Sequence, residues 1–324
     1  MKPALYPRFK FSLLLLIAAS VWGCKKDVLH LQRVVKVDSY SDTDRLNKVF
    51  FMDSLNGFIT GGHRFLHSFI LTTRNGGNTW LPTAHPATQK GIYDINASPA
   101  GTLFNCGFDG KLLLSTDTGR SWRFFQNDYF PYTGIAFTDP THAIMVGGVS
   151  FDEGRIMWTD TTGAMLRRQD FRYQLNKIQM AGRTGYICGF GAVLYTSNGG
   201  ENWTLQDVHG DNFTAMDIHG AEIWLCGNAG SVFHTTNGGS NWQRLRNGDD
   251  LTLPRYRLTD MKFRGSQNGW ATTEDGLLLH SDDGGHHWME YDRFTHAALR
   301  SLAFAPAGGL IAVGDNGEVY RIYE

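Results

Sequence analysis

Arginine and tyrosine gather in four segments where their side chains could hold a ligand. These are "RFFQNDYFPYTG" (123–134), "RRQDFRYQLN" (167–176), "LPRYRL" (253–258) and "YDRF" (291–294). Both residue types often dominate the energy of protein interfaces, and loops bring them to the surface. The alternative is that the rings pack on the fold and the arginines pair with nearby acids. The residues predicted to bind a partner are Phe124, Tyr129, Tyr132, Arg167, Arg168, Arg172, Tyr173, Arg255, Tyr256, Arg257, Tyr291 and Arg293.

Histidine and cysteine, the usual soft metal ligands, show no arrangement that predicts a metal site. His63 and His67 are four residues apart, but they fall in an expected loop, where that spacing does not align two side chains. His286 and His287 lie inside a polar turn and are expected to face solvent. We therefore expect neither a metal nor a cofactor.

One turn recurs along the chain and indicates an internal repeat. "TRNGGNTW", "STDTGRSW", "TSNGGENW", "TTNGGSNW" and "SDDGGHHW" begin at positions 73, 115, 196, 235 and 281. A degenerate copy, "TDTTGAML", begins at Thr159, with Thr161 where Asp or Asn is expected and Leu166 in place of tryptophan. The resulting steps of 37 to 46 residues suit a blade of four short strands.

Each residue of this turn has an expected structural role. The Asp or Asn can accept hydrogen bonds from the backbone of its own turn, the glycine can adopt a positive φ, and the tryptophan can bury a large apolar face. We assign these residues to structure and not to catalysis. They are Asn75, Trp80, Asp117, Trp122, Asn198, Trp203, Asn237, Trp242, Asp283 and Trp288.

The segments between the turns predict an all-β fold. A pair of short apolar runs separated by a polar turn precedes each copy, as in "VFFMDSLNGFITGG" (49–62) and "IAFTDPTHAIMVGG" (135–148). Such runs are typical of an antiparallel meander. The last unit, from Leu299 to Glu324, has three strands and no fourth.

The missing strand is available near the start of the chain, in "VLHLQRVVKV" (28–37). A ring of sheets must close to hide its edges, so we expect this segment to complete the last blade. The prediction is one domain over 28–324, a monomeric seven-bladed β-propeller. The repeated turns would lie on one face of the ring, and the arginine- and aromatic-rich loops on the other.

The blades also account for the cysteines. Aligning the second strands puts Thr60, Cys106, Val146, Cys188, Cys226, Thr272 and Val313 in one position, all with side chains of similar size. This pattern predicts a buried ring position in which free cysteine acts as a small apolar residue. We expect no disulfide among them.

The N-terminus has the pattern of an export signal. A basic start is followed by the apolar run "FSLLLLIAASVW" and then by Gly23 and Cys24. Residues 1–23 resemble a bacterial lipoprotein signal, which implies lipidation of Cys24 and a short tether over 24–27. Lysine and not aspartate follows the cysteine, which favours an outer-membrane anchor and contact with the membrane through the lipid alone. The net charge of −1 gives no support for nucleic-acid binding.

The turns resemble the Asp-box, or bacterial neuraminidase repeat, Ser/Thr-x-Asp/Asn-x-Gly-x-x-Trp. Over nearly the whole mature chain, the blade pattern and the lipoprotein-like start resemble photosystem II stability/assembly factor-like propellers. That resemblance implies a non-enzymatic protein that holds a partner protein. It does not carry a photosynthetic role to this chain, because many unrelated propellers share the blade framework.

Function is therefore predicted as a binding scaffold or an assembly or stability factor in the cell envelope, with a protein partner of unknown identity. One alternative is a propeller that binds glycans with its tyrosine- and phenylalanine-rich loops. The other is a sialidase-like glycosidase, which needs three arginines around a carboxylate, a tyrosine nucleophile and acidic partners. The Phe/Tyr-Arg-Ile/Val-Pro stretch of sialidases is absent after the signal, since "PRYR" (254–257) has another order.

Overall fold

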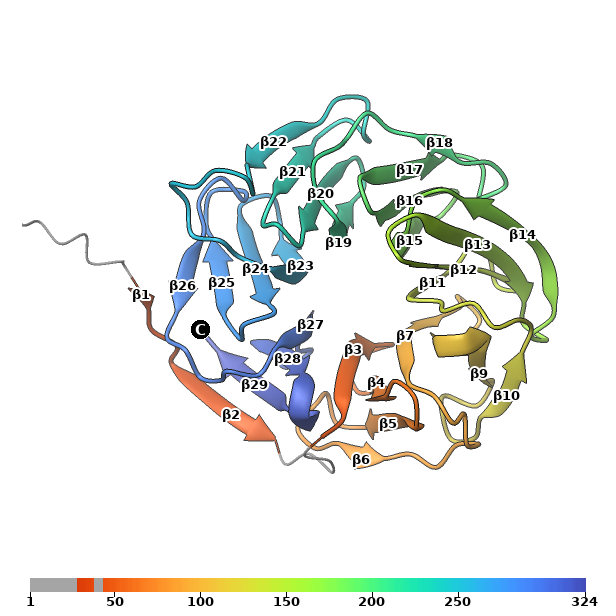
Figure 1. Cartoon of the computed structure of the whole chain (residues 1–324). Coiled ribbons are helices and arrows are strands. Elements are labelled where there is room, and N and C mark those ends of the chain that lie inside the picture. Colours follow the sequence, from red (N-terminus) through yellow and green to blue (C-terminus); the bar gives the residue numbers. More distant parts are fainter. Residues whose placement is uncertain (1–27, 38–42) are drawn as a thin grey trace, which may run out of the picture.

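The computed structural model describes residues 28–37 and 43–324, which form seven sheets arranged in a ring around a central axis (Figure 1). Blade 1 contains β3 (Arg45–Phe51), β4 (Gly57–His63), β5 (His67–Thr73) and β6 (Leu81–Pro82). Blade 2 contains β7 (Ile92–Ala97), β8 (Leu103–Gly107), β9 (Lys111–Ser115) and β10 (Arg123–Gln126). Blade 3 contains β11 (Gly134–Phe137), β12 (His142–Val149), β13 (Glu153–Asp160) and β14 (Met165–Phe171).

The other blades repeat this order from the inside of the ring outward. Blade 4 contains β15 (Leu175–Ala181), β16 (Thr184–Gly189), β17 (Ala192–Thr196) and β18 (Thr204–Leu205). Blade 5 contains β19 (Phe213–His219), β20 (Glu222–Gly227), β21 (Val232–Thr235) and β22 (Gln243–Arg246). Blade 6 contains β23 (Leu258–Arg264), β24 (Asn268–Thr273), β25 (Leu278–Ser281) and β26 (Met289–Tyr291). Blade 7 contains β27 (Leu299–Phe304), β28 (Leu310–Gly314) and β29 (Val319–Tyr323), with the short turns η1 (Phe108–Gly110) and η2 (Asp315–Gly317) in blades 2 and 7.

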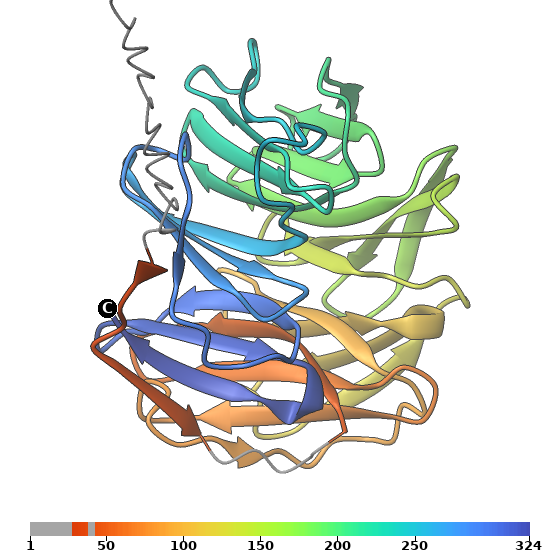
Figure 2. The ribbon, with the colours of Figure 1, turned by 60° about the vertical axis from the view of Figure 1, so that its left-hand side comes forward.

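An N-terminal strand closes the ring. β2 (Arg33–Val37) pairs antiparallel with β29, from Arg33 opposite Tyr323 to Val37 opposite Val319 (Figure 2). This confirms the predicted seven-bladed β-propeller whose last blade is closed by an N-terminal strand. The closing strand is shorter than the segment proposed for it, because β1 (Val28–Leu29) runs parallel to β26 on the outer edge of blade 6 instead. The proposed signal, Cys24 and tether lie outside the described residues.

Apolar packing between blades provides the core. Seven buried clusters are present, and each combines side chains of two neighbouring blades. Between blades 5 and 6, for example, Trp224 stacks on Phe263 with ring centroids 4.0 Å apart. Each sheet therefore buries both faces, which a single four-stranded sheet cannot do alone. No helix in the described part of the chain is long and apolar enough to span a membrane.

The Asp-boxes are hairpins held by their own side chains. In the first box, Thr73 Oγ1 accepts from Gly77 N at 3.0 Å, and Asn75 Oδ1 accepts from Thr79 N at 3.0 Å. The other four complete boxes repeat both bonds. Each box tryptophan joins the apolar cluster shared with the preceding blade, as Trp80 does against blade 7. The box thus holds a turn to its own blade, and its tryptophan packs against the preceding blade.

The degenerate sixth turn works with a different residue. Asp160, one position before Thr161, accepts hydrogen bonds from the backbone nitrogens of Thr162 and Ala164 at 2.8 and 3.2 Å. This turn carries no tryptophan, and the strand that follows it, β14, has seven residues, against two in β6 and β18. The pairing of β13 with β14 shifts by one residue beside the turn, between Trp158 and Thr159.

The equivalent position that three blades fill with cysteine is buried, as the alignment of the second strands predicted. Cys106, Cys188 and Cys226 are free and fully buried in β8, β16 and β20. Burial raises the pKa of the Cys188 thiol to about 12. These thiols therefore stay protonated at neutral pH and act as packing groups.

The box carboxylates are expected to make stability depend on acid pH. Hydrogen bonds, above all that from Ser121, lower the pKa of the Asp117 carboxyl. At Asp283 burial acts to raise the pKa, but hydrogen bonds from His287 outweigh it and lower the pKa to about 2. Because the folded pKa lies below the unfolded value of about 4, this stabilisation is present above pH 4 and is lost as the pH falls toward 2. Asn occupies the same position in three boxes, so Asp117→Asn/Asp283→Asn keeps the turn. We expect the double variant to melt below the wild type at pH 7 and the gap to narrow as the pH falls from 4 to about 2; a gap unchanged by pH contradicts this.

Removal of the closing strand is expected to open the ring. A chain lacking residues 28–37 exposes the edge of β29 and loses the contacts of Val34 and Val37 with two clusters. We expect the free energy of unfolding to fall by at least about 2 kcal/mol and the chain to self-associate through the free edge. Denaturant titration and light scattering measure both. A chain that starts at Leu31 keeps β2 and is the control; equal behaviour of the two truncations contradicts a closing role for β2.

Candidate partner-binding face

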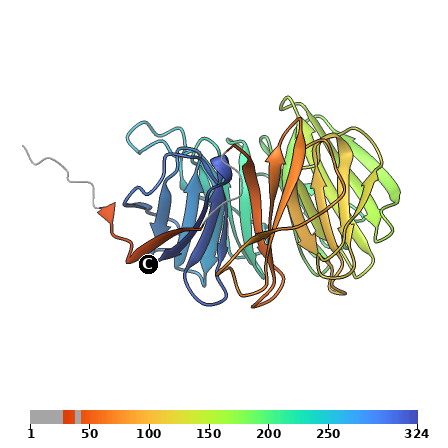
Figure 3. The same ribbon diagram turned by 90° about the horizontal axis from the view of Figure 1, so that it is seen from below.

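The two ends of each sheet present different kinds of connection. The Asp-boxes and the turns between first and second strands lie on one side of the ring, which we call the box face. The turns between second and third strands and the crossovers between blades lie on the other, which we call the top face. Figure 3 shows the ring edge-on, with these connections at its two ends.

A cavity of about 720 Å³ forms the mouth of the central channel on the top face. Irregular positions in the innermost strands build its wall. In six of the seven innermost strands the pairing register shifts by one residue at the same point, and such a bulge redirects a side chain. The redirected residues that line the mouth are Asn47, Tyr93, Thr214, Thr259 and Arg300.

Several of these residues link one blade to the next. Asn47 Nδ2 donates to Ile92 O at 2.8 Å, and Thr214 Oγ1 donates to Leu258 O at 2.9 Å. Thr259 Oγ1 donates to the carbonyl of Leu299 at 2.7 Å. Their polar groups are therefore committed to the ring and are not free for a ligand.

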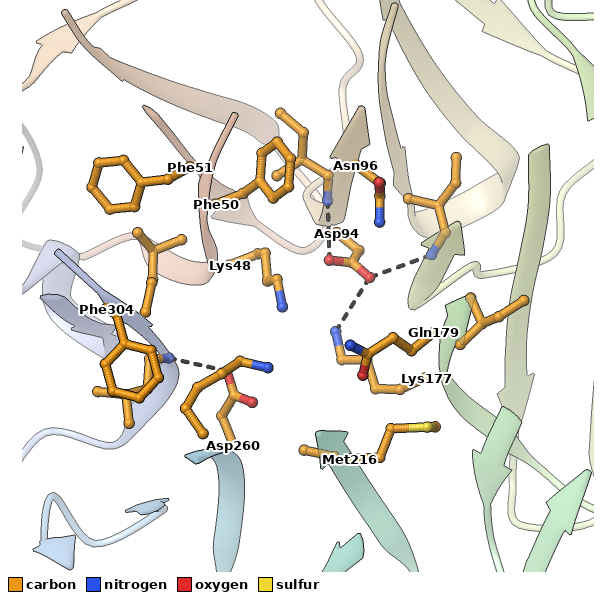
Figure 4. Close-up of a pocket in the computed structure, with 18 residues that line it drawn as sticks. Lys48, Phe50, Phe51, Asp94, Asn96, Lys177, Gln179, Met216, Asp260 and Phe304 are labelled. Atoms are coloured by element: carbon orange, nitrogen blue, oxygen red, sulfur yellow. Dashed lines mark hydrogen bonds and ion pairs between the residues drawn. The ribbon is translucent and has the colours of Figure 1, made fainter. Parts of the chain in front are cut away.

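Below the mouth, the channel holds a cavity of about 390 Å³ whose charged residues also bridge blades (Figure 4). Asp94 accepts from Ile135 N at 3.3 Å, and Asp260 accepts from Leu302 N at 3.0 Å, in each case across a blade boundary. Lys177 lies 3.7 Å from Asp94. Opposite charges therefore alternate around the channel.

Lys48 points into the same cavity, between these two aspartates (Figure 4). Burial lowers its pKa, although Asp260 and Asp94 act in the opposite direction. Burial opposes the ionised form of Asp260 as well, but Lys48 and Lys262 lower the pKa of this carboxyl. The channel charges thus compensate one another.

Exposed aromatic residues stand around the mouth. The turn between the second and third strands carries a phenylalanine in four consecutive blades, at Phe65, Phe108, Phe151 and Phe190. They meet as two pairs, with ring centroids 5.4 Å apart for Phe65 and Phe108 and 4.9 Å apart for Phe151 and Phe190. Phe65, Phe151 and Phe190 are 53%, 56% and 44% exposed. Large apolar rings left in water at one rim are typical of a binding surface.

Basic side chains accompany both pairs. The guanidinium of Arg64 lies 4.6 Å from the centre of the Phe108 ring, and the ammonium of Lys90 lies 5.4 Å from that of Phe65. Arg255 and Arg257 line a third cavity together with Phe151 and Phe190. Blades 1 to 4 therefore present aromatic turns, with cations beside them.

On the other side of the rim, acidic and basic side chains are paired with one another. Arg300 grips Asp315 with two bonds of 3.0 and 2.8 Å and reaches Glu274 at 3.2 Å, while Arg45 reaches Asp315 at 3.1 Å. This contact lowers the pKa of Asp315 and raises that of Arg300, although burial acts against both changes. This network joins the top of blade 6 to blade 7.

The structure divides the predicted binding residues into three groups. Exposed positions on top-face crossovers include Tyr129, Arg172, Arg255, Arg257 and Arg293. Phe124, Arg167 and Arg168 lie on the outer strands β10 and β14, at the side of the ring and not in loops. Tyr132, Tyr256 and Tyr291 are buried, and Tyr173 is half-buried.

Individual contacts show which of these side chains are occupied. Arg167 lies over the Trp158 ring at 3.8 Å and donates to Glu201 O at 2.7 Å, so it faces the box of blade 4. Tyr132 donates to Asp128 at 2.8 Å, and burial raises its pKa. The side chains of Arg168, Arg172 and Arg255 make no hydrogen bond or ion pair within the described residues.

The four rim phenylalanines were not predicted from the sequence. A signal for them exists, because each stands one to four residues after the glycine that follows the aligned Thr/Cys/Val position, as in "CGFDG" and "CGFGA". Aligning the turns as well as the strands would have shown it. Within residues 28–37 and 43–324, no group of three or more His, Cys, Asp or Glu could hold a metal ion.

Paired and unpaired top-face arginines are expected to respond differently to substitution. Arg300→Ala leaves Asp315 and Glu274 without their main partner, and we expect it to lower the free energy of unfolding by about 2 kcal/mol. Arg172→Ala is the matched control and should change that quantity by less than about 0.5 kcal/mol, because its side chain is exposed. Denaturant titration measures both. Equal effects would contradict the distinction.

Known proteins resemble this chain in sequence. The family described as "Photosynthesis system II assembly factor YCF48" matches residues 204–324, which span the end of blade 4 and blades 5 to 7. The "Photosystem II assembly lipoprotein Ycf48" of Synechococcus sp. (strain CC9902) is 26% identical over 195 residues, or 59% of this chain. The match covers 45% of that relative, so the chain spans less than half of its length.

Solved structures resemble the whole ring. "YCF48 from Cyanidioschyzon merolae" has a TM-score of 0.68 at 18% identity, covering 90% of this chain and 98% of that one. "YCF48 bound to D1 peptide" has a TM-score of 0.68 at 18% identity, covering 92% and 99%. A catalytically inactive virginiamycin B lyase from Staphylococcus aureus reaches 0.71 at 11% identity, covering 90% and 99%, so the likeness shows fold alone. The chain is an Asp-box seven-bladed β-propeller that resembles the photosystem II assembly factors of the YCF48 type.

Proposed function

We propose that this protein is a non-enzymatic, exported lipoprotein that holds a protein partner of the cell envelope through its top face. The role is that of a binding scaffold or an assembly or stability factor. The sequence relative named an assembly lipoprotein and the similar structure named as bound to a peptide support this class of function. The photosynthetic partner of those proteins is not carried over.

The observation that carries the proposal is the exposure of aromatic rings beside cations at one rim of the ring. Aromatic and arginine side chains supply most of the energy of protein interfaces. Phe65 and Phe151 are more than half exposed, and both belong to short turns held on the rigid blades. Such anchors lose little freedom when a partner binds.

The occupied state of the polar groups supports a non-enzymatic role. The channel aspartates accept inter-blade hydrogen bonds, and Arg300 and Arg45 are paired with acids. The sialidase alternative needs three arginines free to grip one carboxylate and a tyrosine able to lose its proton. Burial raises the pKa values of Tyr132 and Tyr256, which opposes that use. A glycan ligand is the other alternative, since exposed rings also stack on sugars.

Anchoring at Cys24, with the outer membrane as the expected site, belongs to the same proposal. The first described strand, β1, lies at the outer edge of blade 6 (Figures 1 and 3). An anchor that enters at the side of the ring leaves the top face open to a partner.

Photo-crosslinking in cells tests which face meets a partner. A photoreactive benzoylphenylalanine in place of Phe65 or of Leu55 reports on the top and box faces of the same blade, at 53% and 56% exposure. We expect a crosslinked protein from position 65 and little from position 55. Crosslinks from position 55 alone, or none from either, would contradict the proposal. Hydrolysis of fluorogenic sialosides by the purified chain would contradict the non-enzymatic part, and selective retention on a glycan array would favour the glycan alternative.

A further inference from the structure

We infer that Phe151, Phe190, Arg255 and Arg257 form a subsite for an apolar side chain that stands next to an aspartate or glutamate in an extended segment of the partner. The inference rests on the proposed function and specifies what the top face recognises. The site combines an open cavity, two exposed rings and an arginine, Arg255, whose side chain has no hydrogen bond or ion pair within the described residues.

The cavity is shallow and mixed in character. It has a volume of about 550 Å³ and lies above blades 3 to 6. Phe151 and Phe190 form one wall, with their rings 4.9 Å apart at an angle of 44°. Arg255 and Arg257, on the crossover into blade 6, line the same cavity. An apolar group can therefore contact the rings while a neighbouring group reaches the guanidinium groups.

The turn that presents Phe151 is strained. Ser150 and Phe151 have φ values of +56° and +67°. The connection between β12 and β13 has three residues, 150–152. Consecutive turn residues at positive φ favour Asn and Gly, and a bulky residue at positive φ is a rare outlier. Strained backbone conformations of this kind cluster at binding and catalytic sites, where the surrounding structure holds them in place. The Phe151 ring is exposed to solvent although its backbone is strained.

One residue, Gln174, binds the backbone of both phenylalanines of the pair. Gln174 N donates to Phe151 O at 3.0 Å, and Gln174 O accepts from Phe190 N at 2.8 Å. Its side-chain oxygen also accepts from Phe151 N at 3.3 Å, and its amide nitrogen donates to Asn176 at 2.7 Å. The two aromatic turns are therefore coupled and preorganised before any partner arrives.

The charge of the subsite selects an acidic neighbour. Arg255 has no hydrogen bond or ion pair within the described residues, and Arg257 is 65% exposed and 3.4 Å from Glu274. Asp211 also lines the cavity, but its two oxygens accept from Ala229 N and Ser231 N at 2.8 and 3.0 Å. Arg255 can thus bind a carboxylate in the bidentate geometry that guanidinium favours. Arg257 adds positive charge beside it, although Glu274 already accepts a hydrogen bond from this side chain.

The decisive variant replaces the strained turn with its preferred sequence. Ser150→Asn/Phe151→Gly keeps the turn, so we expect the melting temperature to stay equal or rise, while binding weakens at least tenfold. Loss of both stability and binding would mean that Phe151 is a packing residue and would overturn the inference. Leu55→Ala on the box face is the control and should alter neither quantity.

A twelve-residue peptide library displayed on phage supplies the probe, selected against the full chain. Each peptide is joined to the coat protein through its C-terminus and has no free terminal carboxylate. Any carboxylate that the selection enriches is therefore an aspartate or glutamate side chain. We expect enrichment of an apolar residue adjacent to aspartate or glutamate, and loss of this enrichment with Ser150→Asn/Phe151→Gly. Enrichment without an acidic neighbour, or equal binding to both proteins, would overturn the inference.

Synthetic peptides from this selection separate the two parts of the subsite. Replacing the acidic residue by its amide should weaken binding about tenfold to the wild type but leave Arg255→Ala/Arg257→Ala unchanged. Tight binding that requires a free C-terminal carboxylate would overturn the assignment to a side chain. If crosslinking from position 65 persists while these peptides fail, the proposed function stands and this subsite does not.

Discussion

The burial of each blade against its neighbours is the constraint on which the structure depends. A four-stranded sheet has two apolar faces and can bury them only if another sheet lies on each side, so the row of blades must close on itself. The cluster between blades 7 and 1 brings Val313 and Val319 against Leu46 and Ile59. β2 then covers the edge of β29 that closure would otherwise leave unpaired. Strands from the two ends of the described chain thus belong to one sheet.

The same constraint decides which polar residues are available for function. Residues near the axis are needed to join blades, as Asp94 and Asp260 do through backbone amides of the next blade. The Asp-box side chains likewise accept hydrogen bonds from their own turn, and the box tryptophans pack against the preceding blade. On the top face the pairing of Arg300 with Asp315 and Glu274 also joins two blades, but the turns that carry Phe65, Phe151 and Phe190 leave these rings exposed. Binding residues can therefore vary there without loss of the ring.

The top face combines rigidity with exposure. Phe151 is held in an unfavourable backbone conformation by hydrogen bonds to Gln174, and Phe190 is tied to the same residue. Across the mouth, Arg300 and Asp315 hold their turns by paired charges. A partner segment would therefore contact side chains that are already ordered, and little conformational entropy would be lost on binding. This is the physical basis for treating the ring as a holding surface.

The sequence alone determined the fold class, the number of blades, the Asp-box positions and the origin of the closing strand, because periodic turns and strand patterns are local signals. It also indicated that Cys106, Cys188 and Cys226 occupy one equivalent position. Only the tertiary structure decided which arginines and tyrosines are free: Tyr132 is buried, Arg167 turns toward a box, and Arg255 is open. The pairing of Phe151 with Phe190 was equally hidden, because contacts between blades depend on how the sheets turn about the axis and not on neighbours in the chain.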